Sequence, residues 1–219
     1  MLVGVVSDIH ANRIALEAVL ADMPDVDAVV CAGDVVGYNP WPTACVDSIR
    51  SNGVPTVMGN HDRAVANGTG FGANGMADAG ARYAHDALNG DRLEWLAALP
   101  DSRYCFDGRI RLVHGHPDDP NRYTYPSLFS SRLLGDEDVL VMGHTHVQAH
   151  ELYDDGIVMN PGSVGQPRDG DPDAAYAVVD LDAMTVSERR VEYDIEAVLE
   201  AVEAAGLPPE TGTRLRKGR

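Results

Sequence analysis

The sequence almost lacks lysine, and this shortage limits what its surface can bind. Lys217 is the single lysine in 219 residues, the other sixteen of the seventeen basic residues are arginine, and the formal net charge is −17. Such a chain lacks the broad basic face by which proteins capture nucleic acid, so we expect no nucleic-acid partner. The acidic residues are scattered, and salt would screen their mutual repulsion. We therefore interpret the surface as halophilic, with an ordinary acidic protein as the alternative.

Long apolar runs and paired cysteines are also missing. No run is long enough to cross a bilayer, and the first ten residues, MLVGVVSDIH, have neither the basic region nor the apolar length of a signal peptide. The three cysteines are odd in number and show no close spacing, which fits a reducing compartment. We expect a cytoplasmic protein without a membrane partner, with one domain over residues 1–205 and a frayed tail over 206–219.

What the sequence does contain is a series of short β-rich runs, each followed by polar residues. Five runs are followed by candidate metal ligands or catalytic residues. Asp8 and His10 follow the run at 2–6, Asp34 follows 28–32, Asn60, His61 and Asp62 follow 54–58, His114 follows 109–113, and His144 and His146 follow 138–142. Nearly continuous apolar runs indicate strands that are covered on both faces. Later runs, at 156–160, 174–181 and 185–193, alternate more and indicate antiparallel strands. The dipeptides Asp107-Gly108 and Asp155-Gly156 are typical of hairpin turns.

Helices are expected between these strands. Apolar residues with helical spacing occur in four segments, at 12–23, 77–88, 91–99 and 194–206. Alternating strands and helices followed by hairpins predict an α/β protein with a mixed sheet, or with two sheets packed between helices.

The polar residues that follow the strands predict a metal centre. In an open α/β sheet the loops after the strands gather in one crevice, so these side chains are expected to meet. Imidazole, carboxylate and amide groups are donors that suit divalent transition metals. They are too many for one ion, and they suit two ions about 3.5–4 Å apart that share a bridging carboxylate.

Taken in order, these motifs resemble one known family, the calcineurin-like metallophosphoesterases. The blocks that carry the resemblance are Asp8-x-His10, Gly33-Asp34, Gly59-Asn60-His61-Asp62, His114 and Gly143-His144-Thr145-His146. The stretch Asn160–Arg168, NPGSVGQPR, extends the likeness to the short members of the family. The resemblance implies two packed mixed β-sheets flanked by helices, and a metal-dependent phosphoesterase activity.

The resemblance also implies a role for each motif residue. It assigns one ion to Asp8, His10 and His146, the other to Asn60, His114 and His144, and the bridge between them to Asp34. The ions would be divalent, with Mn²⁺ favoured over Fe, Zn, Ni or Co, and would share a hydroxide as the nucleophile. His61 would protonate the leaving oxygen, Asp62 would orient His61, and Asn60 and Arg168 would contact the substrate.

The expected activity is a phosphodiesterase or phosphatase acting on small phosphoesters or nucleotides. A nuclease is the first alternative, and a non-catalytic scaffold on the same fold is the second. The Asp-Arg-Gly motif of protein Ser/Thr phosphatases is absent after Asp34, where the chain continues as VVGYNPWP. A symmetric homodimer is favoured only by its general frequency among oligomers.

The sequence alone leaves the role of residues 64–105 and the identity of a phosphate-binding arginine open. Residues 64–105 form either a lid over the site or core helices joined by a surface linker, and the Gly-rich stretch 67–75 belongs to this segment. The tyrosines are interpreted as core or lid packing rather than as a platform for stacking bases. Four arginines near the motif loops are candidate phosphate clamps, namely Arg13, Arg63, Arg122 and Arg168.

Overall fold

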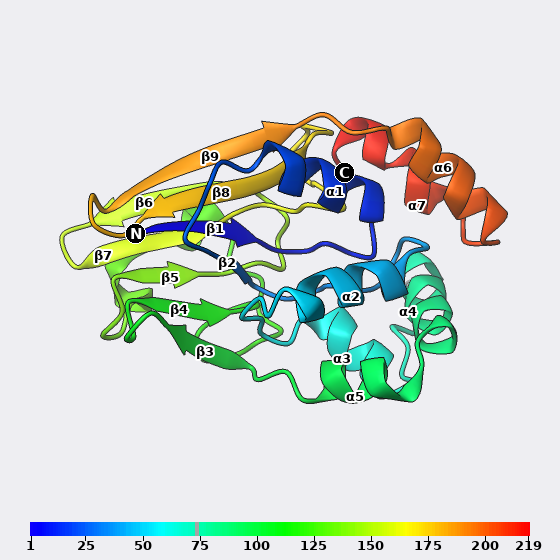
Figure 1. Ribbon diagram of the computed structural model, residues 1–219, viewed down its shortest axis with the longest axis horizontal. Coiled ribbons are helices and arrows are strands. Elements are labelled where there is room, and N and C mark those ends of the chain that lie inside the picture. The colour runs from blue at the N-terminus through cyan, green and yellow to red at the C-terminus, as the bar shows by residue number, and fades with distance from the viewer. Residues whose placement is uncertain (73–74) are drawn as a thin grey trace.

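Two mixed β-sheets pack face to face, and most of the α-helices lie beyond one end of the strands (Figure 1). The computed structural model describes residues 1–72 and 75–219. The two mixed sheets and the flanking helices confirm the fold class predicted from the sequence. Within the described ranges, no helix is both long and apolar enough to cross a membrane.

The first sheet has four strands in the order β2-β1-β8-β9. Its strands are β1 (Leu2–Val6), β2 (Ala28–Cys31), β8 (Ala174–Asp180) and β9 (Thr185–Val191). β1 runs parallel to β2 and antiparallel to β8, and β8 and β9 form the expected closing hairpin.

The second sheet has five strands in the order β3-β4-β5-β7-β6. Its strands are β3 (Ser102–Cys105), β4 (Ile110–Val113), β5 (Val139–Val141), β6 (Ala149–Tyr153) and β7 (Gly156–Asn160). β4, β5 and β7 are parallel, whereas β3 and β6 pair antiparallel at the two edges. The hairpins β3–β4 and β6–β7 turn at the two Asp-Gly dipeptides.

The alternation of side chains along the strands builds two separate cores. In β1, Val3 and Val5 face the second sheet, whereas Val6 faces the helices. β8 does the same with Val179 between the sheets and Tyr176 on the helical side. Since successive side chains of a strand point to opposite faces, strands that are apolar at every position must be covered on both.

The helices differ in position, since the first covers the outer face of the first sheet and the others extend beyond the strands (Figure 1). They are α1 (Arg13–Asp22), α2 (Pro42–Ser51), α3 (Asn60–Ala66), α4 (Gly75–Ala87), α5 (Gly90–Ala97), α6 (Ile195–Ala204) and α7 (Glu210–Thr213). The outer face of the second sheet packs instead against a loop with the 3₁₀ turns η1 (Pro126–Leu128) and η2 (Ser131–Leu133).

Several elements differ from the sequence expectations. Residues 54–58 form no strand, and only an isolated bridge joins Cys31 to Thr56. The helices α2 and α3 were not predicted, although the buried residues of α2, at positions 42, 45, 46 and 49, have helical spacing. The edge strands β3 and β6 were indicated only by the two hairpin dipeptides. In segment 64–105, α3 and α5 contribute Val65 and Leu96 to the main core, so these helices are core helices; positions 73 and 74 lie outside the described residues.

The expectation of a frayed tail over 206–219 is wrong. This segment forms α7 and the 3₁₀ turn η3 (Leu215–Lys217), and Leu207 and Leu215 are buried against α6. The Gly170 N–H also donates to the Gly218 carbonyl oxygen, at 3.0 Å. The two leucines, eight positions apart, supply enough apolar surface to hold the segment down.

We expect Leu215→Ala to lower the free energy of unfolding by about 2–5 kcal/mol, because it empties a fully buried site. Denaturant unfolding in molar KCl measures the change. Leu128→Ala is the matched control, since Leu128 is 57% exposed and its truncation should change stability by less than about 0.5 kcal/mol. Equal effects of the two substitutions would show that the tail does not dock in solution.

Candidate metal centre

The polar residues of the five motifs meet beyond the carboxyl ends of β1, β2, β4 and β5. In Figure 1, β1, β4 and β5 point toward the helical side of the molecule, where these ends lie. The backbone there is unusual, because five motif residues have positive φ angles of 48° to 69°: Asp8, His10, Asp34, His144 and His146. Residues other than glycine rarely adopt this region, and such strain concentrates at functional sites.

The first group of ligand atoms comes from Asp8, His10 and His146, and these atoms all lie within 4.8 Å of one another. His10 Nε2 and His146 Nε2 are 3.1 Å apart, and His146 Nε2 is 3.3 Å from Asp8 Oδ1. All three side chains are buried. Two imidazole nitrogens and a carboxylate oxygen directed at one another match the coordination that a divalent ion requires.

The second group comes from Asp34, His114 and His144, again with all ligand atoms within 4.8 Å. Asn60 joins it, because its Oδ1 lies 3.1 Å from His114 Nε2. Asp34 lies between the two groups: its Oδ2 is 3.3 Å from His114 Nε2 and 3.6 Å from His10 Nε2. This oxygen is buried and has no hydrogen-bond partner within the described part of the chain. A buried carboxylate oxygen without a partner is rare unless an ion meets it.

Backbone carbonyl groups orient the imidazole rings. The Nδ1 atoms of His10, His114 and His146 lie 3.2, 2.8 and 2.6 Å from the carbonyl oxygens of residues 36, 32 and 166. A proton held at Nδ1 by such a carbonyl leaves Nε2 free to bind a metal. His144 is turned the other way, with Nε2 3.2 Å from the Asn121 carbonyl oxygen, which leaves its Nδ1 free.

Burial and mutual proximity shift the pKa values of these groups strongly. Burial raises the pKa of Asp8 to about 7. Burial alone would lower the pKa of His114, but the carboxylate of Asp34 raises it to about 10. Burial works against the charged form of Asp34, yet the surrounding imidazoles, His114 foremost, bring its pKa well below the usual range. Without a cation, a proton on His114 balances the negative charge of Asp34. A bound metal ion can supply this positive charge in place of the proton.

Glycine is required where backbone and ligands approach most closely. A Cβ at Gly59 would lie 2.0 Å from Asp34 Oδ1, and one at Gly143 would lie 2.1 Å from Ser7 Oγ. The glycines of the Gly-Asn-His-Asp and Gly-His-Thr-His motifs therefore serve to admit neighbouring ligand loops.

His61 lies beside the two groups, within a cage of rings. Its ring centroid is 4.8 Å from that of His10, 4.6 Å from Tyr38 and 4.3 Å from Phe71. Its Nδ1 is buried next to Gly37 and has no hydrogen-bond partner among the described residues, so Nε2 is the nitrogen left to meet a substrate. Burial lowers the pKa of His61 to about 4.

The prediction that Asp62 orients the His61 ring is corrected by the structure. The Asp62 carboxylate accepts the Gly59 N–H at 3.0 Å and the Val36 N–H at 3.2 Å. It therefore caps α3 and ties this helix to the loop after Asp34, and it positions His61 only through the backbone. The adjacency of the two residues in sequence did not reveal this, because neighbouring side chains on a helix point apart.

Of the four arginines, Arg168 is the one that enters the site. Its Nη2 donates to Gln166 Oε1 at 2.7 Å and to the Tyr38 hydroxyl at 3.3 Å, while its Nε is buried and has no partner within the described part of the chain. The other three are engaged elsewhere: Arg13 lies over Trp41, Arg63 pairs with Asp101, and Arg122 contacts His116.

Sequence reasoning missed three residues that contribute to the site. Tyr38 contacts both His61 and Arg168, and Gln166 supplies its carbonyl to His146 and its side chain to Arg168. Tyr123 stacks on His144 with ring centroids 3.9 Å apart. A positive φ of 59° at Tyr38 is visible only in the structure, so the residue carried no signal in the sequence.

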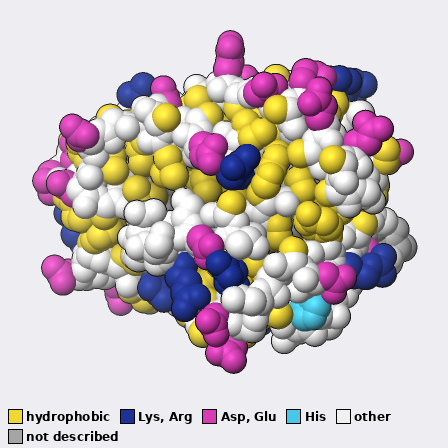
Figure 2. Space-filling model, turned by 45° about the vertical axis from the view of Figure 1, so that its right-hand side comes forward, with side chains coloured by type: hydrophobic (Ala, Val, Ile, Leu, Met, Phe, Trp, Pro, Cys, Tyr) yellow, Lys and Arg dark blue, Asp and Glu magenta, His cyan; other side chains and the backbone are white. Residues whose placement is uncertain are grey.

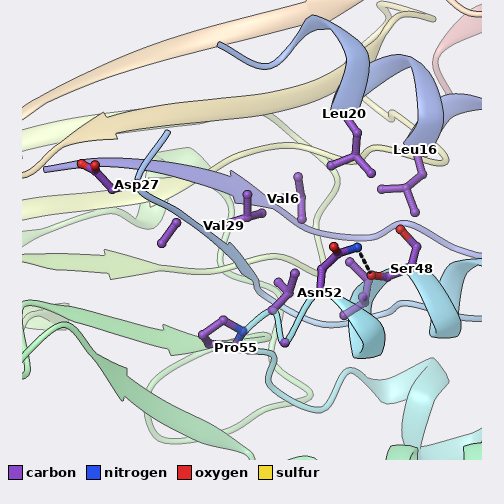
Figure 3. A pocket seen from close by; sticks show the side chains of 12 residues that line it. Val6, Leu16, Leu20, Asp27, Val29, Ser48, Asn52 and Pro55 are labelled. Carbon is purple, nitrogen blue, oxygen red and sulfur yellow. Dashed lines mark hydrogen bonds between the residues drawn. The ribbon is translucent and has the colours of Figure 1, made fainter. Parts of the chain in front are cut away.

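An apolar cavity of about 450 Å³ lies elsewhere, between α1, α2 and the edge strand β2 (Figure 3). Leu16, Leu20, Val29 and Pro55 project into it, and Asn52 donates to the Ser48 carbonyl oxygen at its rim. None of the motif residues lines this cavity among the described residues, so it is separate from the polar cluster. The face shown in Figure 2 carries acidic side chains around its periphery, in agreement with the scattered charge of the sequence.

The fold and the buried ligand set define a metal-dependent hydrolase, and comparison with known proteins identifies its family. Residues 1–184 match the model of the calcineurin-like phosphoesterase superfamily domain. The crystal structure of a metallophosphoesterase from Sphaerobacter thermophilus is similar over 100% of both chains, with 36% identity and a TM-score of 0.86. The chain therefore belongs to the calcineurin-like phosphoesterase superfamily and is a metal-dependent phosphoesterase.

Two curated relatives extend the comparison. The uncharacterized protein MJ0912 of Methanocaldococcus jannaschii is 31% identical over 240 residues, which cover 100% of this chain and 98% of that protein. Phosphodiesterase YfcE of Escherichia coli is 37% identical over 78 residues, which are 36% of this chain and 38% of the relative.

Proposed function

We propose that the protein hydrolyses small phosphodiesters, with two divalent cations held on either side of Asp34. The observation that carries this proposal is the convergence of both ligand groups on one carboxylate oxygen, Asp34 Oδ2, which faces His10 on one side and His114 on the other. The donor set of imidazole and carboxylate groups favours Mn²⁺ and its neighbours in the first transition series. Cations held by these residues would supply Lewis acidity and lower the pKa of a bound water.

The side chains around the cluster divide the remaining tasks. The Arg168 guanidinium lies against Tyr38, whose ring contacts His10 and His61, and from there it binds phosphoryl oxygens as a planar donor. His61 Nε2 holds the proton that the leaving oxygen needs. Burial lowers the pKa of His61 to about 4, and the negative charge of a bound phosphoester acts in the opposite direction. Tyr38 and Phe71 confine the ring and exclude water from its faces.

A preference for diesters follows from charge. A phosphodiester carries one negative charge at neutral pH, whereas a monoester carries up to two, and this protein has a net charge of −17. Approach of the more highly charged substrate is therefore less favourable. The name of the phosphodiesterase YfcE, a relative over part of the chain, points to the same class of substrate.

Hydrolysis of bis-p-nitrophenyl phosphate with Mn²⁺ tests the proposal, with p-nitrophenyl phosphate as the comparison. The assay is run in about 0.1 M KCl, where the charge of the protein acts on the substrate, and in about 1 M KCl, where salt screens it. We expect faster release of p-nitrophenolate from the diester, complete loss of turnover after a chelator, and recovery when Mn²⁺ returns. The metal-free protein serves as the control for contaminating hydrolases, because a contaminant need not follow the metal content of this chain. Failure to hydrolyse either ester with metal bound would overturn the proposal.

A further inference from the structure

Three aromatic rings form a continuous stack that leads from the metal centre to solvent. Tyr123 lies on His144 with a centroid distance of 3.9 Å and an interplanar angle of 22°. Tyr125 continues the stack at 6.0 Å from Tyr123, with an angle of 13°. These two tyrosines are 46% and 47% exposed, so the expectation of core packing does not hold for them.

The loop that carries the two tyrosines is held in place. The Asn121 carbonyl oxygen lies 3.2 Å from His144 Nε2, and Thr124, between the two tyrosines, is only 2% exposed. Backbone hydrogen bonds also close the loop, from the Asp119 N–H to the His116 carbonyl oxygen and from the Arg122 N–H to that of Asp119. The exposed rings are therefore presented in a preorganised position, which lowers the entropy lost when a ligand stacks on them.

The chemistry of the stack favours a planar uncharged group attached to the phosphate. Parallel exposed rings bind the faces of nucleobases, and such stacking tolerates any base. The reacting phosphorus belongs beside the ligand group of Asp34, His114 and His144, whereas Tyr125 is the ring farthest along the stack from His144. In a nucleoside phosphodiester a ribose separates the base from the phosphate, which matches exposed rings that lie beside the metal ligands rather than among them.

We propose that Tyr123 and Tyr125 form a subsite that stacks the base of a nucleoside phosphodiester, which makes a small nucleotide the substrate class of this enzyme. The inference rests on the proposed phosphodiesterase activity. A nucleic-acid strand fits less well, because the net charge of −17 opposes the capture of a polyanion.

The test compares two diesters with the same leaving group, thymidine 5′-(p-nitrophenyl phosphate) and methyl p-nitrophenyl phosphate. Both release p-nitrophenolate, so their ratio of kcat/KM isolates the contribution of the nucleoside. We expect a ratio well above one in the wild type, and a fall of roughly 5- to 100-fold in Tyr125→Ala, mainly through KM. Tyr125→Phe should restore the ratio, because it keeps the stacking face.

Tyr104→Ala is the matched control, since Tyr104 is 55% exposed on β3 and lies near Arg111 rather than near the site. An unchanged ratio in Tyr125→Ala, or an equal fall in Tyr104→Ala, would overturn the subsite. If the wild type cleaves neither ester with Mn²⁺, the proposed activity fails instead.

Equilibrium binding distinguishes a failure of the base subsite from a failure of the proposed phosphodiesterase activity. Calorimetry with adenosine 5′-monophosphate and ribose 5-phosphate measures the base contribution without turnover, and we expect the nucleotide to bind more tightly in the wild type but not in Tyr125→Ala. Equal affinity for both ligands in the wild type would overturn the subsite. Tighter binding of an oligonucleotide than of the mononucleotide would also overturn the small-nucleotide assignment and favour a nucleic-acid substrate.

Discussion

Asp34→Ala should abolish hydrolysis of bis-p-nitrophenyl phosphate and release bound metal. Asp34 Oδ2 faces both ligand groups, so the substitution removes a ligand that the two groups share. Asp34 Oδ1 also accepts the backbone N–H of His61 at 2.8 Å, so the substitution removes a contact that positions the proposed general acid. Loss of a residue that only supports a ligand costs about 10- to 100-fold in metal affinity or activity. Removing the shared ligand itself should exceed that range, with a fall of more than about 1000-fold in kcat/KM.

Metal content and turnover should be measured on the same samples, by elemental analysis after gel filtration and by p-nitrophenolate release. Asp47→Ala is the control, because Asp47 is an exposed carboxylate paired with Arg92 on the surface. Asp34→Asn adds a sharper comparison, since it keeps the shape of the side chain and removes its charge. Turnover retained in Asp34→Ala with full metal content would contradict the role of Asp34.

His61→Ala should lower kcat by about 100- to 10,000-fold while the protein keeps its metal, because a general acid contributes this much. The loss should depend on the leaving group. p-Nitrophenolate is stable as an anion and needs little protonation, whereas phenolate needs more. The substitution should therefore slow a phenyl diester more than the matching p-nitrophenyl diester.

The leaving-group dependence is what distinguishes an acid from a structural residue. If His61 merely packs against Tyr38 and Phe71, its loss should slow both diesters by the same factor. His150→Ala is the matched control, because His150 lies on β6 and pairs with Glu188 at 2.7 Å. Unequal metal content between wild type and His61→Ala would instead assign His61 to metal binding.

Strands were predictable from the sequence where a run of apolar residues also pairs with neighbouring strands in the fold. β1, β4 and β5 are nearly continuous apolar runs, and both faces of their sheets are indeed covered. Residues 54–58 are also largely apolar but include Pro55, which lacks a backbone N–H, and only Thr56 makes a bridge, to Cys31. A run of apolar residues shows that a segment is buried, and the neighbouring strand decides whether it joins a sheet.

The sequence by itself determined the kinds of donor and their place at the ends of strands. It also indicated the family, because the motifs are rare and occur in a fixed order. These properties are local, since each depends on one strand and the few residues that follow it.

Only the tertiary structure decided which atoms converge. It directed Asp34 Oδ2 between His10 and His114, which are 104 residues apart in the chain, and it made Asp62 a helix cap. It also stacked Tyr123 on His144 and left Tyr125 exposed beside it. The physical reason is that strand pairing and loop packing set these distances, and both are determined by contacts between segments far apart in sequence.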